Sequence, residues 1–377
     1  MKEKKFGFGC MRLPLKDRTD STSFDYDRIY KTFDEFLRQG FKYFDTAYTY
    51  HRNQSEKIIR EVLVERYSRE KFQIATKMPL RKFQNDEDLE KIFDEQLKNC
   101  GVEYFDFYLL HNIGCNVYEK CCKYGAFEFL ERKKAEGKIK VSGMSFHDTP
   151  ELLDEMLSNY GKYIDFVQLQ INYIDWEQKS VQSRRCLEVA NKYNKPVTVM
   201  EPCKGGNLIN IPHEAEEVMK NYNPQASIAS WAMRFAASQK GVFRVLSGMN
   251  EVDQVVDNAA TFNNFKPLNE EEYEIIKKVA KIINSNVTIP CTACEYCIEN
   301  CPKKIAIPNY FSLYNSFKSK TGGRSSQRIY YRNTILSGHG KASECIKCGK
   351  CEQACPQHIK IREYLEEVTK TFEDKNK

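Results

Sequence analysis

The sequence lacks long hydrophobic runs and clusters of one charge. No stretch approaches the roughly 18 apolar residues that a membrane-spanning helix needs, and the basic start MKEKK is not followed by the apolar segment of a secretion signal. We therefore expect a cytoplasmic protein without a membrane partner. The 58 basic and 52 acidic residues are scattered along the 377-residue chain, so no nucleic-acid partner is predicted either.

A glycine-rich G-x-G-x-x-G turn after the first strand-like run is also absent, which argues against an open, doubly wound nucleotide-binding sheet. Short strand-like runs instead alternate with amphipathic helical stretches. Eight such runs occur, at 6–9, 41–44, 72–77, 105–110, 139–144, 165–170, 197–201 and 243–247. Eight β–α units in about 260 residues predict an α/β fold of the (β/α)8, or TIM, barrel class.

Cysteine, by contrast, is abundant, and 15 cysteines without a secretion signal favour metal or redox use over disulfides. Eight of them form two C-x2-C-x2-C-x3-C-P motifs, at 291–302 and 345–356. This spacing binds [4Fe–4S] clusters, and the fourth cysteine of each motif binds the cluster of the other. Zinc is the weaker alternative, because it has no use for three close cysteines followed by Cys-Pro. One cluster is expected on Cys291, Cys294, Cys297 and Cys355, and the other on Cys345, Cys348, Cys351 and Cys301.

The C-terminal part resembles a bacterial two-cluster ferredoxin domain, with a longer segment between Cys301 and Cys345. Within that segment, 320–328 is predicted to be a loop and 329–336 a helix. The other seven cysteines have no ligand spacing and are expected to be buried or idle thiols, with a strained disulfide between the adjacent Cys121 and Cys122 as the weaker alternative. They are Cys10, Cys100, Cys115, Cys121, Cys122, Cys186 and Cys203.

The strand–helix alternation ends near residue 267. Asn269 is a predicted helix N-cap with Glu272 as its capping-box partner, and apolar residues then recur at helical spacing. We predict a barrel over 1–265, a linking helix over 266–285, and a small, mainly helical, ferredoxin-like iron–sulfur domain over 286–377.

Polar residues stand at the ends of successive predicted strands, where the chemistry of such barrels takes place. One polar or ionisable residue at the end of an otherwise apolar strand, repeated from strand to strand, predicts a shared pocket. These residues are Asp45, Lys77, His111, Ser145 and Gln168, with Tyr50 just beyond Asp45. His147 is expected to lie on the surface, because lone polar residues after strands are mostly solvated, and a position in the pocket is the alternative.

Three segments carry a specific resemblance. FDTAYTYHRNQSE (44–56), IATK (74–77) and YLLH (108–111) resemble the signature, lysine strand and histidine strand of the aldo/keto reductases. The likeness covers most of residues 5–260, and the whole chain is similar to members that carry a C-terminal two-cluster ferredoxin domain. It implies an oxidoreductase that interconverts a small carbonyl compound and an alcohol with a nicotinamide cofactor. The implied catalytic residues are Asp45, Tyr50, Lys77 and His111.

The chemistry of this tetrad is physically consistent. Reduction of a carbonyl needs a proton donor at the developing alkoxide, and Tyr50 is the expected general acid. The ammonium of Lys77 is expected to lower the pKa of Tyr50, Asp45 to hold Lys77, and His111 to orient the substrate oxygen. Tyr48 is the competing tyrosine, and the motif spacing favours Tyr50.

The resemblance also implies a nicotinamide site. Gly248 and Gln254 stand where cationic residues usually hold a 2′-phosphate, so the choice between NADP and NAD is left open. A loop that binds no dinucleotide tightly is the alternative. The implied contacts are Ser145, Gln168, Met200, Gly205, Ser247, Gly248, Met249, Gln254 and Asn258.

The role of the clusters has more than one interpretation. Clusters pass single electrons and nicotinamide passes a hydride, so a flavin would normally mediate, and no flavin motif is recognisable. The clusters therefore either transfer electrons or brace the fold. The alternative function is a ferredoxin-linked reductase, or an electron-transfer or redox-sensing partner of another protein, in which the clusters and not NAD(P)H supply electrons.

Overall fold

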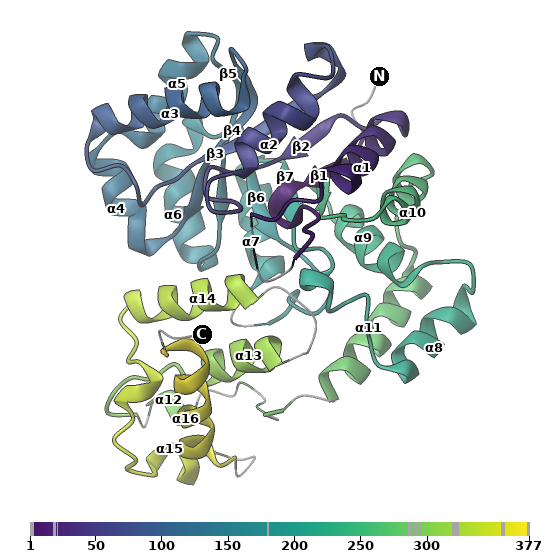
Figure 1. Cartoon of the computed structure of the whole chain (residues 1–377). Helices are drawn as coiled ribbons and strands as arrows, with labels where there is room; N and C mark the ends of the chain where they lie inside the picture. The colour runs from purple at the N-terminus through teal and green to yellow at the C-terminus, as the bar shows by residue number, and fades with distance from the viewer. Residues whose placement is uncertain are drawn as a thin grey trace.

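Eight parallel strands close into a barrel in the order of the chain (Figure 1). Each strand predicted from the sequence overlaps an observed one, so the barrel prediction is confirmed. The computed structural model describes residues 4–17, 20, 22–178, 181–285, 288–289, 291, 293, 296–299, 301–318, 324–355 and 359–374. The strands are β1 (Phe6–Gly9), β2 (Tyr43–Asp45), β3 (Gln73–Met78), β4 (Phe105–Ile113), β5 (Ile139–Phe146), β6 (Phe166–Gln170), β7 (Val197–Met200) and β8 (Val242–Ser247).

Helices surround the barrel and continue into a C-terminal unit. The barrel helices are α1 (Tyr26–Arg38), α2 (Ser55–Ile59), α3 (Asp86–Cys100), α4 (Cys115–Lys123), α5 (Ala126–Ala135), α6 (Pro150–Tyr160), α7 (Ser183–Lys192), α8 (His213–Tyr222), α9 (Ile228–Ser238) and α10 (Val252–Asn263). Then come α11 (Glu270–Ser285), α12 (Tyr296–Glu299), α13 (Ile307–Lys318), α14 (Arg324–Leu336), α15 (Lys350–Gln353) and α16 (Ile361–Phe372). Short 3₁₀ turns lie at Cys10–Arg12, Arg69–Lys71, Gly161–Tyr163, Lys204–Gly206 and Ala342–Glu344, and a π-helical turn at Arg60–Val64.

The helices form where capping residues precede apolar faces. In α1, the Asp25 side chain accepts a hydrogen bond from the Arg28 amide at 3.2 Å, and Ile29, Phe33 and Phe36 are buried against the strands. This burial of aromatic and aliphatic side chains between helices and strands supplies most of the stabilisation of the barrel.

Side chains from β2, β3, β4, β6 and β8 form an apolar cluster inside the barrel, on the N-terminal side of the polar strand ends. Its members are Tyr43, Ala75, Phe107, Leu109, Phe166 and Leu246. Gly143 on β5 leaves room for this packing, because a Cβ there would lie 2.4 Å from a carbon of the Phe166 ring. The interior is therefore a packed layer, on which the polar strand ends rest.

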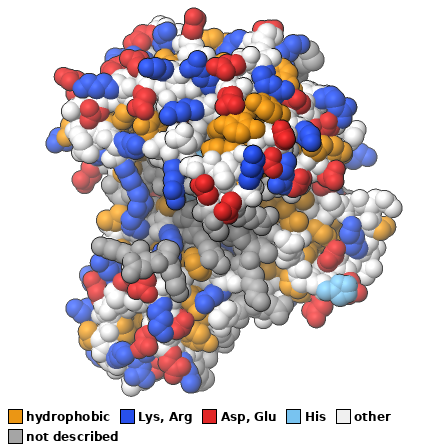
Figure 2. All heavy atoms as spheres, in the orientation of Figure 1, with side chains coloured by type: hydrophobic (Ala, Val, Ile, Leu, Met, Phe, Trp, Pro, Cys, Tyr) orange, Lys and Arg blue, Asp and Glu red, His pale blue; other side chains and the backbone are white. Residues whose placement is uncertain are grey.

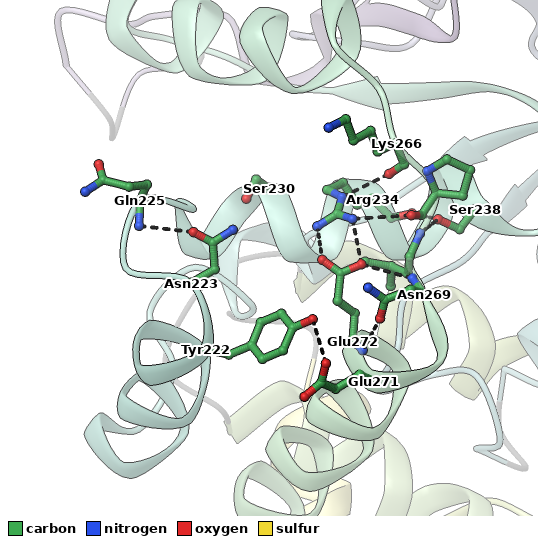
Figure 3. A network of polar contacts seen from close by, with 12 residues as sticks. Tyr222, Asn223, Gln225, Ser230, Arg234, Ser238, Lys266, Asn269, Glu271 and Glu272 are labelled. Carbon is green, nitrogen blue, oxygen red and sulfur yellow. Dashed lines mark hydrogen bonds and ion pairs between the residues drawn. The ribbon is translucent and has the colours of Figure 1, made fainter.

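Helix α11 begins where the sequence predicts it. The Asn269 amide donates to Glu272 Oε2 at 3.0 Å, and the Glu272 amide donates to Asn269 Oδ1 at 2.8 Å, so the predicted capping box is confirmed. Glu272 also accepts two hydrogen bonds from Arg234 of α9, at 2.6 and 2.7 Å (Figure 3). The guanidinium further donates to the carbonyl of Lys266 at 3.1 Å. This clamp ties α11 to the outside of the barrel.

The C-terminal unit has its own apolar core, built by α13, α14 and α16. Tyr310, Phe311, Leu365 and Val368 are buried in it. Tyr331 of α14 joins them, and its hydroxyl donates to Glu373 at 2.5 Å. The predicted helix at 329–336 is confirmed. The predicted loop at 320–328 is wrong for 324–328, which open α14, and its first residues lie outside the described part of the chain.

This unit packs against the ends of the barrel strands, with α14 on the side that faces the barrel (Figure 1). Asn333 of α14 donates to the carbonyl of His147 at 2.9 Å, and Ser312 of α13 donates to Gln178 Oε1 at 3.1 Å. Val181, from the segment after β6, is buried in the core of the C-terminal unit. Contacts made by the segments that follow β5 and β6 therefore join the barrel to the C-terminal unit.

The surface is of mixed charge on the face drawn in Figure 2, where acidic and basic side chains are interspersed. Within the described residues, no helix has the length and apolar character that a membrane crossing requires. No disulfide links the described cysteines, and Cys10, Cys100, Cys121 and Cys186 are buried thiols, as expected.

We expect Glu272→Ala to lower the free energy of unfolding by about 2–4 kcal/mol, because it removes a helix cap and leaves Arg234 without its carboxylate. Urea denaturation followed by circular dichroism measures this loss. Glu274→Ala is the matched control, since the Glu274–Lys277 pair is 70% exposed on both sides and such pairs contribute about 0–1 kcal/mol. Equal losses in the two variants would contradict the clamp.

Candidate active site

The polar residues at the strand ends form a layer on the C-terminal side of the apolar cluster inside the barrel. Strand side chains alternate in direction, so a residue two positions after an interior-facing one also faces inward. Asp45 follows Tyr43 by two, Lys77 follows Ala75, His111 follows Leu109, and Gln168 follows Phe166. Strand geometry alone therefore directs these four side chains to one place.

Lys77 lies at the centre of this layer. Its Nζ donates to Asp45 Oδ1 and to the carbonyl of Thr46, both at 2.6 Å, and lies 3.4 Å from the hydroxyl of Tyr50. Lys77 is 1% exposed and Asp45 is 3% exposed. Tyr50 comes from the turn after β2 and is half-buried. The structure thus brings three of the four predicted catalytic residues into direct contact.

His111 completes the group from β4. Its ring lies edge-on to Tyr50 with centroids 5.9 Å apart. Tyr48, the competing tyrosine, points elsewhere and donates to Glu95 of α3 at 3.1 Å. Tyr50 is the tyrosine beside the lysine, as the motif spacing predicts.

Burial and charge set the protonation of this group. Burial alone would lower the pKa of Lys77, but Asp45 and Tyr50 outweigh it, and the pKa is raised. Burial also raises the pKa of Tyr50, and the charge of Lys77 offsets only part of that shift. Lys77 lowers the pKa of Tyr50 as expected, but desolvation of the phenolate is the larger effect, so the net shift is upward. Burial, then Lys77 and then His147 hold the pKa of His111 well below its usual range.

A buried network that sequence reasoning missed supports Lys77 from behind. Gln96 of α3 donates to Glu56 Oε1 at 2.6 Å and to the carbonyl of Lys77 at 3.1 Å. Thr76 donates to the same Glu56 oxygen at 2.6 Å, and Glu56 is 1% exposed. Glu56 belongs to the Ser-Glu pair that ends the 44–56 segment, so that pair was the available signal. Its carboxylate connects α2, α3 and β3.

Ser145 and Gln168 lie beside the predicted catalytic group. Ser145 Oγ accepts a hydrogen bond from the Asn112 amide at 2.7 Å. Gln168 Nε2 donates to Asp45 Oδ2 at 3.3 Å, which orients the amide. Gln168 Oε1 is buried and has no hydrogen-bond partner among the described residues. A buried acceptor of this kind fits a ligand that brings an N–H donor.

The segment after β7 is held by a buried ion pair. Lys204 contacts Asp175, and these residues are 4% and 0% exposed. Asp175 also accepts from Gln170 and Asn172, each at 2.7 Å. Gly205 follows with a left-handed φ of 65°, which glycine adopts without strain. The Lys204–Asp175 pair joins the segments after β6 and β7, and sequence reasoning did not find it. Met200, the last residue of β7 and a predicted nicotinamide contact, is half-buried.

The remaining predicted nicotinamide contacts lie at the end of β8 and on α10. Asn258 Nδ2 donates to Ser247 Oγ at 3.2 Å, and Gln254 Oε1 accepts from the Asn250 amide at 2.9 Å. Met249 is buried, with 1% of the residue exposed. At Gly248 a Cβ would lie 3.6 Å from Arg12 Cβ, so this cation borders the segment.

Three cysteines of the second motif line a cavity. Its lining includes Cys345, Cys348 and Cys351 together with Cys301 from the first motif. Ile305, Ile307 and Leu365 supply apolar walls. Four thiols from two motifs around one cavity fit the predicted ligand set of one [4Fe–4S] cluster.

Three of the four cysteines predicted to bind the other cluster belong to the described part of the chain. Cys297 and Cys355 are buried in the core of the C-terminal unit, and Cys291 packs against it. Cys294 lies outside the described residues. In the described part of the chain, no three cysteine, histidine or acidic side chains are close enough to hold a single metal ion.

His147 departs from the sequence-based expectation. It is 9% exposed and not a surface residue, because α14 covers it. The Tyr330 ring of α14 lies edge-on to its imidazole, with centroids 5.7 Å apart. No local sequence pattern announces this contact between residues far apart in the chain.

Comparison with known proteins assigns both parts. The model of the aldo/keto reductase family matches residues 5–281, and that of the 4Fe-4S dicluster domain matches residues 290–359. The uncharacterized oxidoreductase YqkF of Bacillus subtilis is 22% identical over 304 residues, covering 73% of this chain and 92% of that protein. The 4-dihydromethyl-trisporate dehydrogenase of Mucor mucedo is 34% identical over 111 residues, which is 28% of this chain and 30% of that protein.

Solved structures show the same barrel. The holo form of an aldo-keto reductase from Bacillus halodurans superposes with a TM-score of 0.59 at 22% identity, covering 74% of this chain and 92% of that one. An aldo-keto reductase from Klebsiella pneumoniae in complex with NADPH gives a TM-score of 0.57 at 17% identity, covering 74% and 95%.

We expect Lys77→Met to lower the free energy of unfolding by about 3–5 kcal/mol, because it leaves the Asp45 carboxylate buried without its cation. The double variant Asp45→Asn with Lys77→Met should recover most of that loss, since it removes both charges. Urea denaturation of the two variants and the unmodified protein measures the difference. A double variant no more stable than Lys77→Met would contradict the assigned pairing.

Proposed function

The chain belongs to the aldo/keto reductase family and is an oxidoreductase of that type with a C-terminal 4Fe-4S dicluster domain, and from this premise we propose that it interconverts a carbonyl and an alcohol with a nicotinamide cofactor. The observation that carries the proposal is the contact of the Tyr50 hydroxyl with the buried Lys77–Asp45 pair. A proton donor beside a fixed positive charge is what reduction of a carbonyl requires.

Each residue of the group has a distinct part in the proposed reaction. A bound nicotinamide supplies or accepts the hydride. Tyr50 gives its proton to the oxygen that becomes the alcohol, and its raised pKa keeps that proton in place at neutral pH. Lys77 stabilises the phenolate left behind, and Asp45 keeps Lys77 charged and in position. His111, neutral because of its lowered pKa, orients the substrate oxygen by a hydrogen bond.

The residues beside this group suit a nicotinamide ring. Gln168 Oε1 is a buried acceptor without a partner among the described residues, and the carboxamide of the ring carries an N–H donor for it. Ser145 is its neighbour across the β5–β6 pairing. Near Gly248 and α10, Arg12 is partly exposed and forms an ion pair with Glu201 at 3.7 Å, and Arg28 pairs with Glu251. Both cations already have carboxylate partners, so NADP and NAD are both candidates, to be assayed side by side.

In the C-terminal unit, eight cysteine thiolates would hold two [4Fe–4S] clusters, which supply one-electron transfer when bound. The cavity that Cys301 shares with Cys345, Cys348 and Cys351 supports cross-motif ligation. The second candidate function is a reductase in which these clusters supply the electrons. The contacts of α13 and α14 with the strand ends favour it, because they bring the cluster-binding unit to the catalytic end of the barrel.

We expect Tyr50→Phe to lower kcat/KM for carbonyl reduction by about 10²–10⁴-fold, because the proton donor is lost. The assay follows oxidation of NADPH and of NADH with a panel of aldehydes. Tyr48→Phe is the matched control, since its hydroxyl bonds Glu95 away from Lys77, and it should keep near-normal kcat. Full activity in Tyr50→Phe would refute the tetrad mechanism.

The same preparation separates the two candidate functions. If carbonyl reduction occurs with dithionite-reduced protein and no nicotinamide, and NAD(P)H gives no turnover, the clusters are the electron source. Turnover with NAD(P)H that persists when the clusters stay oxidised supports the hydride mechanism.

Cross-motif ligation predicts which cysteine variants resemble one another. Cys301→Ser and Cys351→Ser should lose the same cluster, about four of eight irons, and leave the same residual spectrum. Cys297→Ser should lose the other cluster. Iron analysis and electron paramagnetic resonance of anaerobically purified protein test this, with Cys122→Ser of α4 as the control. A Cys301→Ser spectrum that matches Cys297→Ser would contradict cross-motif ligation.

A further inference from the structure

The inward-facing row of β5 continues past Ser145. Val141 packs against the interior cluster, Gly143 lies against Phe166, and Ser145 follows them. His147 comes two residues after Ser145, just beyond the end of the strand, so the same alternation directs it inward. Its ring is nine-tenths buried, and Nδ1 has no hydrogen-bond partner among the described residues.

His147 and the catalytic His111 are neighbours. β4 and β5 pair in parallel, with Ile113 opposite Phe146, so both imidazoles stand at the ends of adjacent strands. Each is uncharged at neutral pH. Burial lowers the pKa of His147 to about 4, and burial is also the largest cause of the lowered pKa of His111. A neutral imidazole with an unused ring nitrogen is able to accept or donate one hydrogen bond. The proposed mechanism gives the reacting oxygen to Tyr50 and His111, so this nitrogen is left for another part of the substrate.

Helix α14 holds His147 in this position. The Tyr330 ring packs edge-on against the imidazole, and Asn333 Nδ2 donates to the His147 carbonyl at 2.9 Å. That hydrogen bond orients the side-chain amide of Asn333, a residue that is 3% exposed. The Oδ1 atom of the same amide has no hydrogen-bond partner among the described residues. On the opposite side of the barrel end, burial raises the pKa of Glu201 after β7, and Ser326 of α14 lies among the neighbours that oppose this rise. The helix therefore spans the segments that follow β5 and β7.

We propose that α14 of the iron–sulfur domain forms one wall of the carbonyl-binding site, and that His147, positioned by Tyr330 and Asn333, hydrogen-bonds a polar substituent of the substrate next to its carbonyl. This inference rests on the proposed function and adds a specificity residue to it. The unpaired polar atoms of both units favour a hydroxylated carbonyl compound, because an acceptor left unpaired in a buried site costs binding energy.

The test compares two aldehydes that differ in hydroxyl groups, glyceraldehyde and propanal. In His147→Phe, which keeps a ring against Tyr330 but has no nitrogen, KM for glyceraldehyde should rise about tenfold more than KM for propanal. His147→Asn places an amide near the position of Nδ1 and should recover most of that difference. KM for the dinucleotide should stay within about twofold, which separates a substrate contact from general disruption.

Variants of α14 test the wall itself. Asn333→Ala should shift the glyceraldehyde-to-propanal KM ratio in the same direction as His147→Phe. Leu336→Ala is the matched control, because Leu336 is on the same helix and 52% exposed. Iron content and circular dichroism show that each variant is folded. Equal KM increases for both aldehydes, or an unchanged ratio in His147→Phe, would overturn the proposal.

Failure of this inference is distinguishable from failure of the proposed function. If Tyr50→Phe abolishes turnover while His147→Phe leaves the KM ratio unchanged, the function stands and the wall is refuted. If Tyr50→Phe keeps full turnover, the tetrad is refuted. The wall is then judged by calorimetric binding of glycerol and 1-propanol to the unmodified protein and to His147→Phe. A selective loss of glycerol binding supports it, and no selective loss refutes it.

Discussion

A buried ammonium group must be matched by negative charge and hydrogen-bond acceptors, and the upper layer of this barrel is arranged around that requirement for Lys77. Asp45 supplies the charge, the carbonyl of Thr46 supplies a second acceptor, and Gln168 holds the far oxygen of Asp45. Tyr50 then remains within 3.4 Å of the same nitrogen. The arrangement that satisfies the lysine also positions the phenol.

The charge of Lys77 reaches beyond its direct contacts. Burial is the main cause of the lowered pKa of His111, and the positive charge of Lys77 on the neighbouring strand lowers that pKa further. Behind the strand, Gln96 and Glu56 fix the backbone of Lys77 through α3 and α2. Side chains on three successive strands thus depend on one ion pair, and each would lose its present protonation or orientation if that pair were broken.

The barrel and the positions of its polar strand ends could be predicted from the sequence because both follow from short-range patterns. Alternation of strands and helices gave the eight β–α units, and strand ends gave Asp45, Lys77 and His111. The period of two on β5 would also have turned His147 inward, had the row Val141, Gly143, Ser145 been extended by one step. The raised pKa of Tyr50 was not predictable, because it depends on how much water the folded protein excludes.

Contacts between distant parts of the chain were likewise beyond sequence patterns. The helix at 329–336 was predictable, but its position against His147 depends on the packing of the whole C-terminal unit. The buried pair of Lys204 and Asp175 joins two segments whose side chains look like ordinary loop residues in the sequence. In each case the deciding quantity is the distance between elements, which local spacing does not contain.

The order of the chain gives the position of α14 a consequence for how the protein is made. All eight strands have been synthesised when Ser247 is added, whereas α14 begins only at Arg324. The cavity that Cys301 lines is completed later still, by Leu365. Because domains generally fold as units during synthesis, the barrel is able to close before the helix that contacts His147 exists. The end of the barrel that carries the Lys77–Asp45 pair is therefore without α14 in the nascent protein, and α14 packs against it only in the finished one.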